Sequence, residues 1–159
     1  MAKVSQRQIV AKVEAAKDPC TNQKGPSWAQ PNRKYFAQVS GGEVQASVEK
    51  VFDGGARYPE VLSGPFEVGD LTVTRHYDPA VDGPLLKHYR PLVGKARFNV
   101  TVFTLNQDLV QPGTARQYPQ ALLVNIAEPD GDSSSGAPAT FSLTFACGQL
   151  ASGEVATAC

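Results

Sequence analysis

Few side chains in this sequence have the types and the spacing that catalysis or metal binding requires. His76 and Asp78 stand two residues apart, so on a strand they would share one face. A histidine beside a carboxylate can exchange protons near neutral pH or contribute to a metal site. The second histidine, His88, lies twelve residues further along. We interpret His76 and Asp78 as exposed polar residues near the end of a strand.

The sequence frames that accompany nucleophilic and phosphate chemistry are missing. The serines at 133–135 lie in a loop of low complexity, without the Gly-x-Ser-x-Gly frame of a nucleophile elbow. The glycine pairs at 41–42 and 54–55 lack the Lys-Ser/Thr ending and the following helix of a phosphate-binding loop. The aromatic residues do not have the arrangement of an RNA-recognition module. The sequence therefore predicts no enzyme activity and no catalytic, cofactor-binding or metal site.

The cysteines and the apolar runs indicate the environment of the protein. Cys20, Cys147 and Cys159 form an odd, sparse set without a Cys-x-x-Cys pair, which favours reduced thiols and gives no support for structural zinc. No secretory signal opens the chain, and no apolar run approaches the roughly 18 residues that cross a membrane. We expect a soluble protein that is made in a cytoplasm and has no membrane partner.

The charges are balanced overall but unevenly placed. The chain has 15 basic and 15 acidic side chains, and seven of the basic ones lie within residues 1–40, against two acidic ones. After Arg116 the charged side chains are all acidic: Glu128, Asp130, Asp132 and Glu154. This asymmetry is either chance variation on a solvated surface or a means for copies to meet head to tail. No cationic face is evident, so bulk binding of nucleic acid is not expected.

Helix signals occur at two places in the chain. Ser5 and Gln8 have the spacing of a capping box, and the apolar residues that follow recur at helical spacing, which predicts a helix over 5–17. Asp82 as a cap and Pro84 in the first turn predict a short helix over 82–90. The intervening segment 18–34 is rich in proline, glycine and asparagine and is expected to be a loop.

Strand signals dominate the remainder. Polarity alternates over 43–49, 70–77 and 140–147, and the segments 97–105 and 120–128 are rich in β-branched or apolar residues. Segments 53–69 and 129–138 contain clusters of Gly, Pro and Asp and are expected to be turns and loops. The sequence therefore predicts a mainly β domain of about six or seven strands with one short central helix.

Two of these strands have one face made only of acidic, amide or hydroxyl side chains. These residues are Glu43, Gln45, Ser47, Glu49, Thr140, Ser142 and Thr144. The residues of the opposite faces are apolar and are expected in the core, among them Val44, Val48, Phe141, Leu143 and Phe145. A polar face of this kind lies either against bulk solvent or along the water-filled bore of a closed barrel.

The stretch over residues 67–105 resembles phage tail tube proteins and their relatives in contractile injection systems. Gly69-Asp70-Leu71-Thr72-Val73-Thr74-Arg75 leads through Tyr77-Asp78-Pro79 into the short helix, and a strand with Val100-Thr101-Val102 follows. In that family a Gly-Asp-Leu-Thr-Leu-Thr-Arg strand runs through an Asp-containing turn into a helix, and a Val-Thr-Val strand comes next. Residues 139–146 also look like the late strand of the family, whereas residues 1–40 have no match.

The resemblance implies a fold and an assembly. The fold is two packed antiparallel β-sheets, in a tail-tube-like β-sandwich or half-barrel, with one short flanking helix. The assembly is a hexameric ring that stacks head to tail into a tube, with the inner strands joined into one continuous barrel. The family has no active site, so no catalytic residue is implied.

The resemblance also implies a role, partners and a location. The protein would be a structural virion protein of a phage tail, assembled in the cytoplasm of the host bacterium. Its partners would be other copies of itself and the tape-measure, tail terminator and baseplate or tip proteins. The genome would pass through without specific binding, and the seven polar residues above would line a mildly acidic bore that repels DNA. Residues 1–40 depart from the family, and we expect them to form an N-terminal arm and loop that reaches a neighbouring ring, followed by a β domain, 41–159.

Two other functions fit the sequence. One is the inner tube protein of a secretion or contractile injection system, which shares the fold and would be separated by its genomic neighbours. The other is a monomeric β-barrel binding module, which a measurement of size in concentrated solution would identify.

Overall fold

A strongly curled antiparallel sheet forms the body of the protein. The computed structural model describes residues 3, 5–16, 35–106, 109–110 and 115–148. Six strands follow one another in the order β1–β6–β8–β9–β5–β2, and β7 pairs with β6. Their bounds are β1 Ile9–Ala15, β2 Gln38–Gly41, β5 Leu71–His76, β6 Arg97–Asn106, β7 Leu109–Val110, β8 Arg116–Ala127 and β9 Thr140–Ala146.

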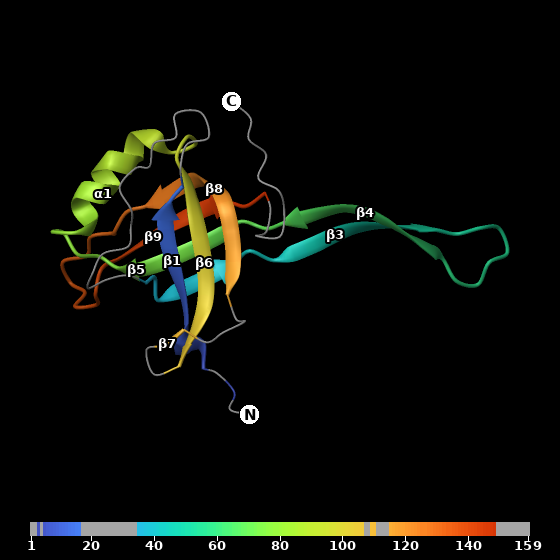
Figure 1. Cartoon of the computed structure of the whole chain (residues 1–159), viewed down its shortest axis with the longest axis horizontal. Coiled ribbons are helices and arrows are strands. Elements are labelled where there is room, and N and C mark those ends of the chain that lie inside the picture. The colour runs from blue at the N-terminus through green and yellow to red at the C-terminus, as the bar shows by residue number, and fades with distance from the viewer. Residues whose placement is uncertain (1–2, 4, 17–34, 107–108, 111–114, 149–159) are drawn as a thin grey trace.

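The curled sheet has two halves that pack across one another. Strands β1, β6 and β8 run at a steep angle to β9, β5 and β2 (Figure 1). Strand β8 belongs to both halves, because its first part pairs with β6, its second part pairs with β9, and the register shifts between Leu123 and Asn125. A pair of backbone hydrogen bonds between Ala11 and Phe36, of 3.0 and 2.7 Å, draws the two ends of the strand order together. The mainly β half-barrel predicted from the sequence is confirmed.

Aromatic side chains fill the space between the two halves. Phe36, Phe98, Phe141, Phe145 and Tyr118 are each at most 1% exposed. Their rings meet edge to face, with 5.6 Å between the centroids of Phe98 and Phe145 and 5.9 Å between those of Phe36 and Phe141. Edge-to-face contacts of this kind add to the free energy gained by burying the rings. The core is therefore a single cluster to which both halves of the sheet contribute.

The short central helix is present and packs on this core. Helix α1, Asp82–Tyr89, is followed by a 3-10 turn, η2, Arg90–Leu92. Leu85, Leu86 and Tyr89 are buried, and the Tyr89 ring lies 5.0 Å from that of Phe98. The predicted short helix is confirmed. No helix in the described ranges is long and apolar enough to cross a membrane.

The helix predicted over 5–17 is wrong. A 3-10 turn, η1, covers Gln6–Gln8, and the segment then enters the sheet as β1, antiparallel to β6. The Gln8 side chain does accept a hydrogen bond from the Ser5 backbone N–H, at 2.7 Å. The short apolar run fits both periods, and the strand period places Ala11, Val13 and Ala15 in the core, where β6 offers a partner. The proposed division of the chain at residue 40 stays a prediction, but this part of the N-terminal segment belongs to the sheet.

The turn-rich segment 53–69 also departs from its prediction. Residues Glu60–Val68 form strand β4, which pairs with β3, Val44–Val51, in a separate two-stranded sheet. Gly64 and Pro65 lie where the register of this pair shifts, so they occupy a bulge. A side chain at Gly64 would collide with Ser47. Glycine and proline therefore mark an irregularity within a strand here, whereas the sequence pattern indicated a loop.

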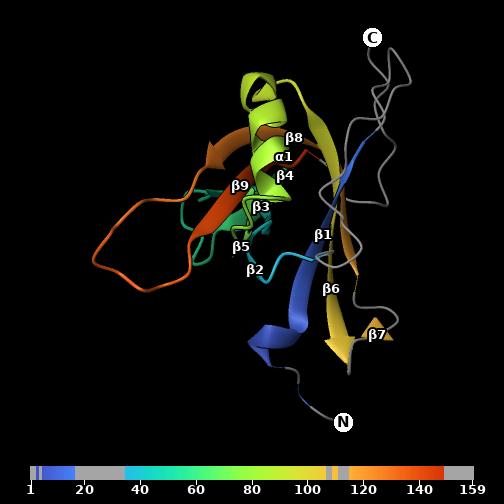
Figure 2. The ribbon, with the colours of Figure 1, turned by 90° about the vertical axis from the view of Figure 1, so that its left-hand side faces the viewer.

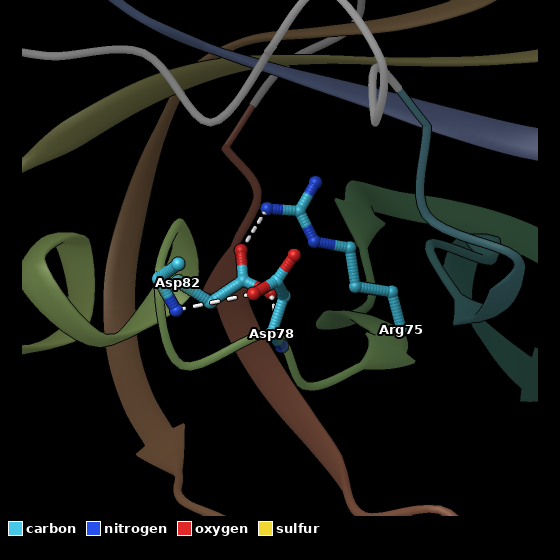
Figure 3. A network of polar contacts seen from close by, with 4 residues as sticks. Arg75, Asp78 and Asp82 are labelled. Atoms are coloured by element: carbon cyan, nitrogen blue, oxygen red, sulfur yellow. Dashed lines mark hydrogen bonds and ion pairs between the residues drawn. The ribbon is translucent and has the colours of Figure 1, made fainter.

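A buried ion pair joins strand β5 to helix α1. The Arg75 guanidinium donates to the Asp82 carboxylate, and the two side chains are 3% and 0% exposed (Figure 3). The other Asp82 oxygen accepts from the Asp78 backbone N–H at 3.0 Å. Arg75 also lies over the rings of Phe36 and Phe141, at 4.6 and 5.5 Å from their centroids. Asp82 was expected to cap the helix from outside; it is instead the first residue of α1, with Val81 as the cap.

The ion pair predicts a large loss of stability when one partner is removed. Arg75→Ala and Asp82→Ala should each lower the free energy of unfolding by about 3–5 kcal/mol, because each leaves a buried charge without its partner. The double variant Arg75→Met with Asp82→Leu should recover most of this loss. Urea denaturation measures all three. Arg90→Ala is the control: it breaks an exposed pair with Glu128 and should cost at most about 1 kcal/mol. A similar loss in the control and in the buried variants would contradict the assignment.

Candidate assembly surface

The two-stranded sheet forms an arm that projects from the body of the protein (Figure 1). We call β3, β4 and the turn between them the arm. It continues the pair that β2 and β5 form inside the main sheet: Gln38 stands opposite Thr74 in the sheet, and Val44 stands opposite Val68 in the arm. The register is unbroken from Gln38 opposite Thr74 to Ala46 opposite Phe66, so it runs from the body into the arm as far as the bulge at Gly64 and Pro65.

One face of the arm is mainly apolar and uncovered. Cross-strand partners share a face, so Val44 and Ala46 of β3 lie on the same side as Val68 and Phe66 of β4. Beyond the bulge the same face carries Val48 opposite Ser63 and Lys50 opposite Val61. The exposed fractions are 52% for Val44, 58% for Val48 and Val61, and 57% for Phe66. Val44 and Val48 were expected in the core of the chain, and that prediction is wrong, because the arm has no second layer. Phe141, Leu143 and Phe145 are buried, as predicted.

The opposite face of the arm is polar and carries negative charge. It presents Glu43, Gln45, Ser47 and Glu49, all exposed, together with Glu67, the cross-strand partner of Gln45. The Gln45 amide donates to the Glu43 carboxylate at 3.3 Å, as expected for neighbours on one face. Towards the tip, Val51 and Leu62 interrupt the polar surface. The alternation predicted from the sequence holds, so the arm is a ribbon with one mainly apolar and one mainly acidic face.

The second predicted polar face lies on the body of the protein. Ser142 and Thr144 are half-buried on the outer side of β9, and Thr140 is exposed at its start. Strand β5 adds Thr72 and Thr74, which stand opposite Thr144 and Ser142. The hydroxyl oxygens of Thr72 and Thr144 are 3.4 Å apart.

This hydroxyl surface extends over four strands. Ser40 and Gln38 of β2 stand opposite the two β5 threonines, and Asn125 of β8 stands opposite Thr144. None of the residues named on this surface is charged. Of the residues on this surface, the sequence predicted a position along the bore for those of β9 alone. The alternation of β5 was evident in the sequence, but its pairing with β9 was not. The two predicted polar sets therefore lie on different elements, the arm and the body, and their orientation towards a bore stays a prediction.

Side chains that were considered for catalysis or metal binding form hydrogen bonds within local turns. The Asp78 carboxylate accepts from the Ala80 backbone N–H at 3.1 Å, within the turn before α1. Ser134 donates both its backbone N–H and its hydroxyl to Asp132, at 3.0 and 2.7 Å, and these bonds hold the pKa of Asp132 below its usual value. Among the described residues no group of three His, Cys, Asp or Glu side chains is placed to hold a metal ion. The loop that contains Asp132 projects from the body (Figure 2).

Two of the charges considered for head-to-tail contacts are paired within the chain. Lys12 forms an ion pair with Glu14 across 2.7 Å on the outer side of β1. Glu128 pairs with Arg90 at the end of α1. Both pairs are largely exposed, so each stabilises the fold by at most about 1 kcal/mol and remains available for exchange with a partner.

Solved structures share this fold over nearly the whole chain, although no protein-family model and no curated protein sequence matches it. A chain of the anti-feeding prophage (AFP) baseplate, 6-fold symmetrised, aligns over 94% of this chain and 94% of its own, at 19% identity and a TM-score of 0.67. A chain of an extracellular contractile injection system, the PVC sheath–tube complex in the extended state, aligns over 93% and 89%, at 13% identity and 0.66. A chain of the virion of a native gene transfer agent (GTA) particle aligns over 93% and 97%, at 11% identity and 0.55. The protein thus has a tail-tube-like fold.

The buried thiol of Cys147 predicts a pH dependence of stability. Burial, and secondly the charge of Asp70, raise the pKa of Cys147 from 9.0 to about 11. The unfolded chain would therefore lose this proton first, so stability should be complete below pH 9 and should fall by roughly 1–3 kcal/mol as the pH rises to 11. Urea denaturation between pH 8 and 10 should show a shallower decline for Cys147→Ala. Equal slopes for the two proteins would contradict the prediction.

Proposed function

We propose that the protein is a tube subunit, a structural protein whose copies form rings that stack into the tube of a phage tail. The observation that carries this proposal is the apolar face of the arm, uncovered in a chain with a tail-tube-like fold. An isolated two-stranded ribbon is marginally stable in water. Its two outer edges also leave backbone N–H and C=O groups without ladder partners. The arm gains a second layer and further strand partners when another chain covers it.

The partner that fits best is a second copy of the same chain. The arm lies on one side of the body, so a copy that receives it on its own body offers its arm to the next copy in turn. Such head-to-tail contacts close into a ring when the rotation between copies permits. Hexamers are the ring size that the sequence resemblance implies, and the AFP baseplate, which contains a chain of the same fold, is 6-fold symmetrised. Burial of the exposed halves of Val44, Val48, Val61 and Phe66 would contribute about 1 kcal/mol for each side chain.

The polar surfaces suit a conduit. If rings stack, the acidic face of the arm and the hydroxyl surface of β5 and β9 would line the bore. Neither surface carries a lysine or an arginine among the residues named above, so phosphates would find no cationic partners there. DNA would then pass without specific binding. Tape-measure, tail terminator and baseplate or tip proteins are the other partners of this proposal, and the virion tail is the location.

A second candidate is the inner tube of a contractile injection or secretion system. The fold matches the AFP and PVC chains with TM-scores of 0.67 and 0.66, against 0.55 for the gene transfer agent chain. Both candidates assemble in the same way and differ in what passes through the bore. Sheath and ATPase genes beside the gene for this protein would favour the injection or secretion system.

Removal of the apolar face should prevent assembly. The purified protein is expected to form rings or tubes at high concentration, visible by negative-stain electron microscopy. Val48→Asp with Phe66→Asp should remain folded but should need at least about tenfold more protein to assemble, because it places two charges in the contact. Gln45→Asp is the matched control, since it adds a carboxylate to the opposite face of the same strand, and it should assemble normally. Strictly monomeric behaviour of the unmodified protein in every condition would overturn the proposed function.

Reversal of the charge on the acidic face should slow the passage of DNA. In Glu43→Lys with Glu49→Lys, tubes should still form, because neither residue lies on the apolar face of the arm. Lysines along the bore would bind phosphates, so DNA release from particles that carry the variant should be slower and should recover at higher salt. Asp130→Lys with Asp132→Lys gives the same change in net charge on the β8–β9 loop and is the control. Ejection kinetics equal to those of the unmodified particle would count against a bore lined by this face.

A further inference from the structure

We propose that the hydroxyl of Tyr118 fixes the direction in which the arm leaves the body, and that this direction determines whether copies can assemble. Tyr118 would thus be a positioning residue and not itself part of the contact. The inference rests on the proposed function, because it takes the arm as the element that reaches a second copy. Three features of the place where the arm joins the body support it.

The first feature is the continuity of the backbone at this place, which we call the arm root: residues 41–43 and 69–70. The Gly42 N–H donates to the carbonyl of Asp70 at 3.0 Å, and the Gly69 N–H donates to the carbonyl of Glu43 at 2.7 Å. These bonds connect the β2–β5 pair with the β3–β4 pair without an intervening loop. Any change in the backbone of the arm root therefore turns the whole arm.

The second feature is a bend made by two glycines. Gly41 and Gly42 have φ angles of +83° and +72°, a region that residues with a side chain rarely adopt. A Cβ atom at Gly41 would collide with the carbonyl oxygen of Asp70, and one at Gly42 would lie 2.6 Å from the hydroxyl oxygen of Tyr118. The bend is thus packed tightly on both sides, against the opposite strand and against the side chain of Tyr118.

The third feature is the hydrogen bond from the body to this bend. Tyr118 lies on β8, is 1% exposed, and donates its hydroxyl proton to the carbonyl of Gly42 at 3.0 Å. In the strand order β8 is separated from β2 by β9 and β5, so the bond crosses the interior of the half-barrel. A buried hydroxyl or carbonyl that lacks a hydrogen-bond partner destabilises the fold, so this hydrogen bond holds the two groups together.

The length of the arm makes its direction sensitive to this bond. Strand β3 has 8 residues, which at about 3.3 Å each span about 26 Å. A rotation of about 10° at the root would therefore move the tip by about 4–5 Å, by the same strand spacing. A displacement of that size would bring the apolar face of the arm out of register with a receiving surface that has fixed strand positions.

The test compares Tyr118→Phe with Tyr89→Phe in the full chain. Both substitutions keep a buried aromatic ring and remove its hydroxyl, but Tyr89 lies on α1, away from the arm root. In Tyr118→Phe the Gly42 and Gly69 amides should exchange with solvent roughly tenfold faster, because the arm root opens more often. The protein concentration needed for rings or tubes should rise by a similar factor. Tyr89→Phe should change neither quantity, and gel filtration and thermal unfolding should show both variants folded.

A second variant approaches the same contact from the arm. Gly42→Ala places a methyl group against the Tyr118 hydroxyl and should also raise the concentration needed for assembly. Combined with Tyr118→Phe, its effect should be smaller than the product of the two separate effects, since both disturb one contact. Full independence of the two effects would argue against the proposed positioning.

The outcomes separate this inference from the proposed function. If the unmodified protein forms tubes and folded Tyr118→Phe forms them at the same concentration, the inference is overturned and the proposed function stands. If the unmodified protein forms no tubes, the proposed function fails and this inference fails with it. Unchanged exchange of the Gly42 and Gly69 amides in Tyr118→Phe would also overturn the inference, whatever the assembly result.

Discussion

The antiparallel pair of β2 and β5 does not end where the body of the protein ends, and most features of the molecule depend on that continuity. Inside the body this pair is packed against Phe36, Phe141 and the other core aromatics. Beyond Gly41 and Gly42 the same pair continues as an arm with water on both faces. Hydrophobic burial stabilises the first part, whereas the second part exposes several large apolar side chains. The chain therefore contains a folded domain and a projecting element whose large apolar side chains are exposed.

The packed body of the protein supports the arm. Two halves of one sheet cross over a single aromatic core (Figure 1), and the two hydrogen bonds between Ala11 and Phe36 bring the ends of the strand order together. The buried pair of Arg75 and Asp82 then fixes helix α1 to β5, the strand that leads out of the arm. A buried ion pair stabilises little compared with apolar residues of the same size, but removal of one partner is costly, so the pair holds α1 against β5. A rigid body lets a small number of contacts at the arm root set the geometry of a long projection.

Two of the described surfaces are polar and lack positive charge among the residues named above. The acidic face of the arm and the hydroxyl surface of β2, β5 and β9 offer hydrogen bonds without positive charge. Such surfaces hydrate well and do not attract phosphates. Asp78, which was considered for chemistry, accepts a hydrogen bond within the turn before α1, and the thiol of Cys147 is buried. These features support the structural role proposed above.

The sequence by itself determined which side chains share a face, because alternation along a strand is a local property. That rule correctly predicted the polar set Glu43 to Glu49, the buried set Phe141 to Phe145 and the strand from Leu71 to His76. Only the tertiary structure decided what each face meets. The apolar run at Ile9 to Ala15 became a strand because β6 offered a partner, and Val44 and Val48 stayed exposed because the arm leaves the core. Partners distant in sequence, such as Tyr118 and Gly42, depend on the path of the whole chain, which no local pattern encodes.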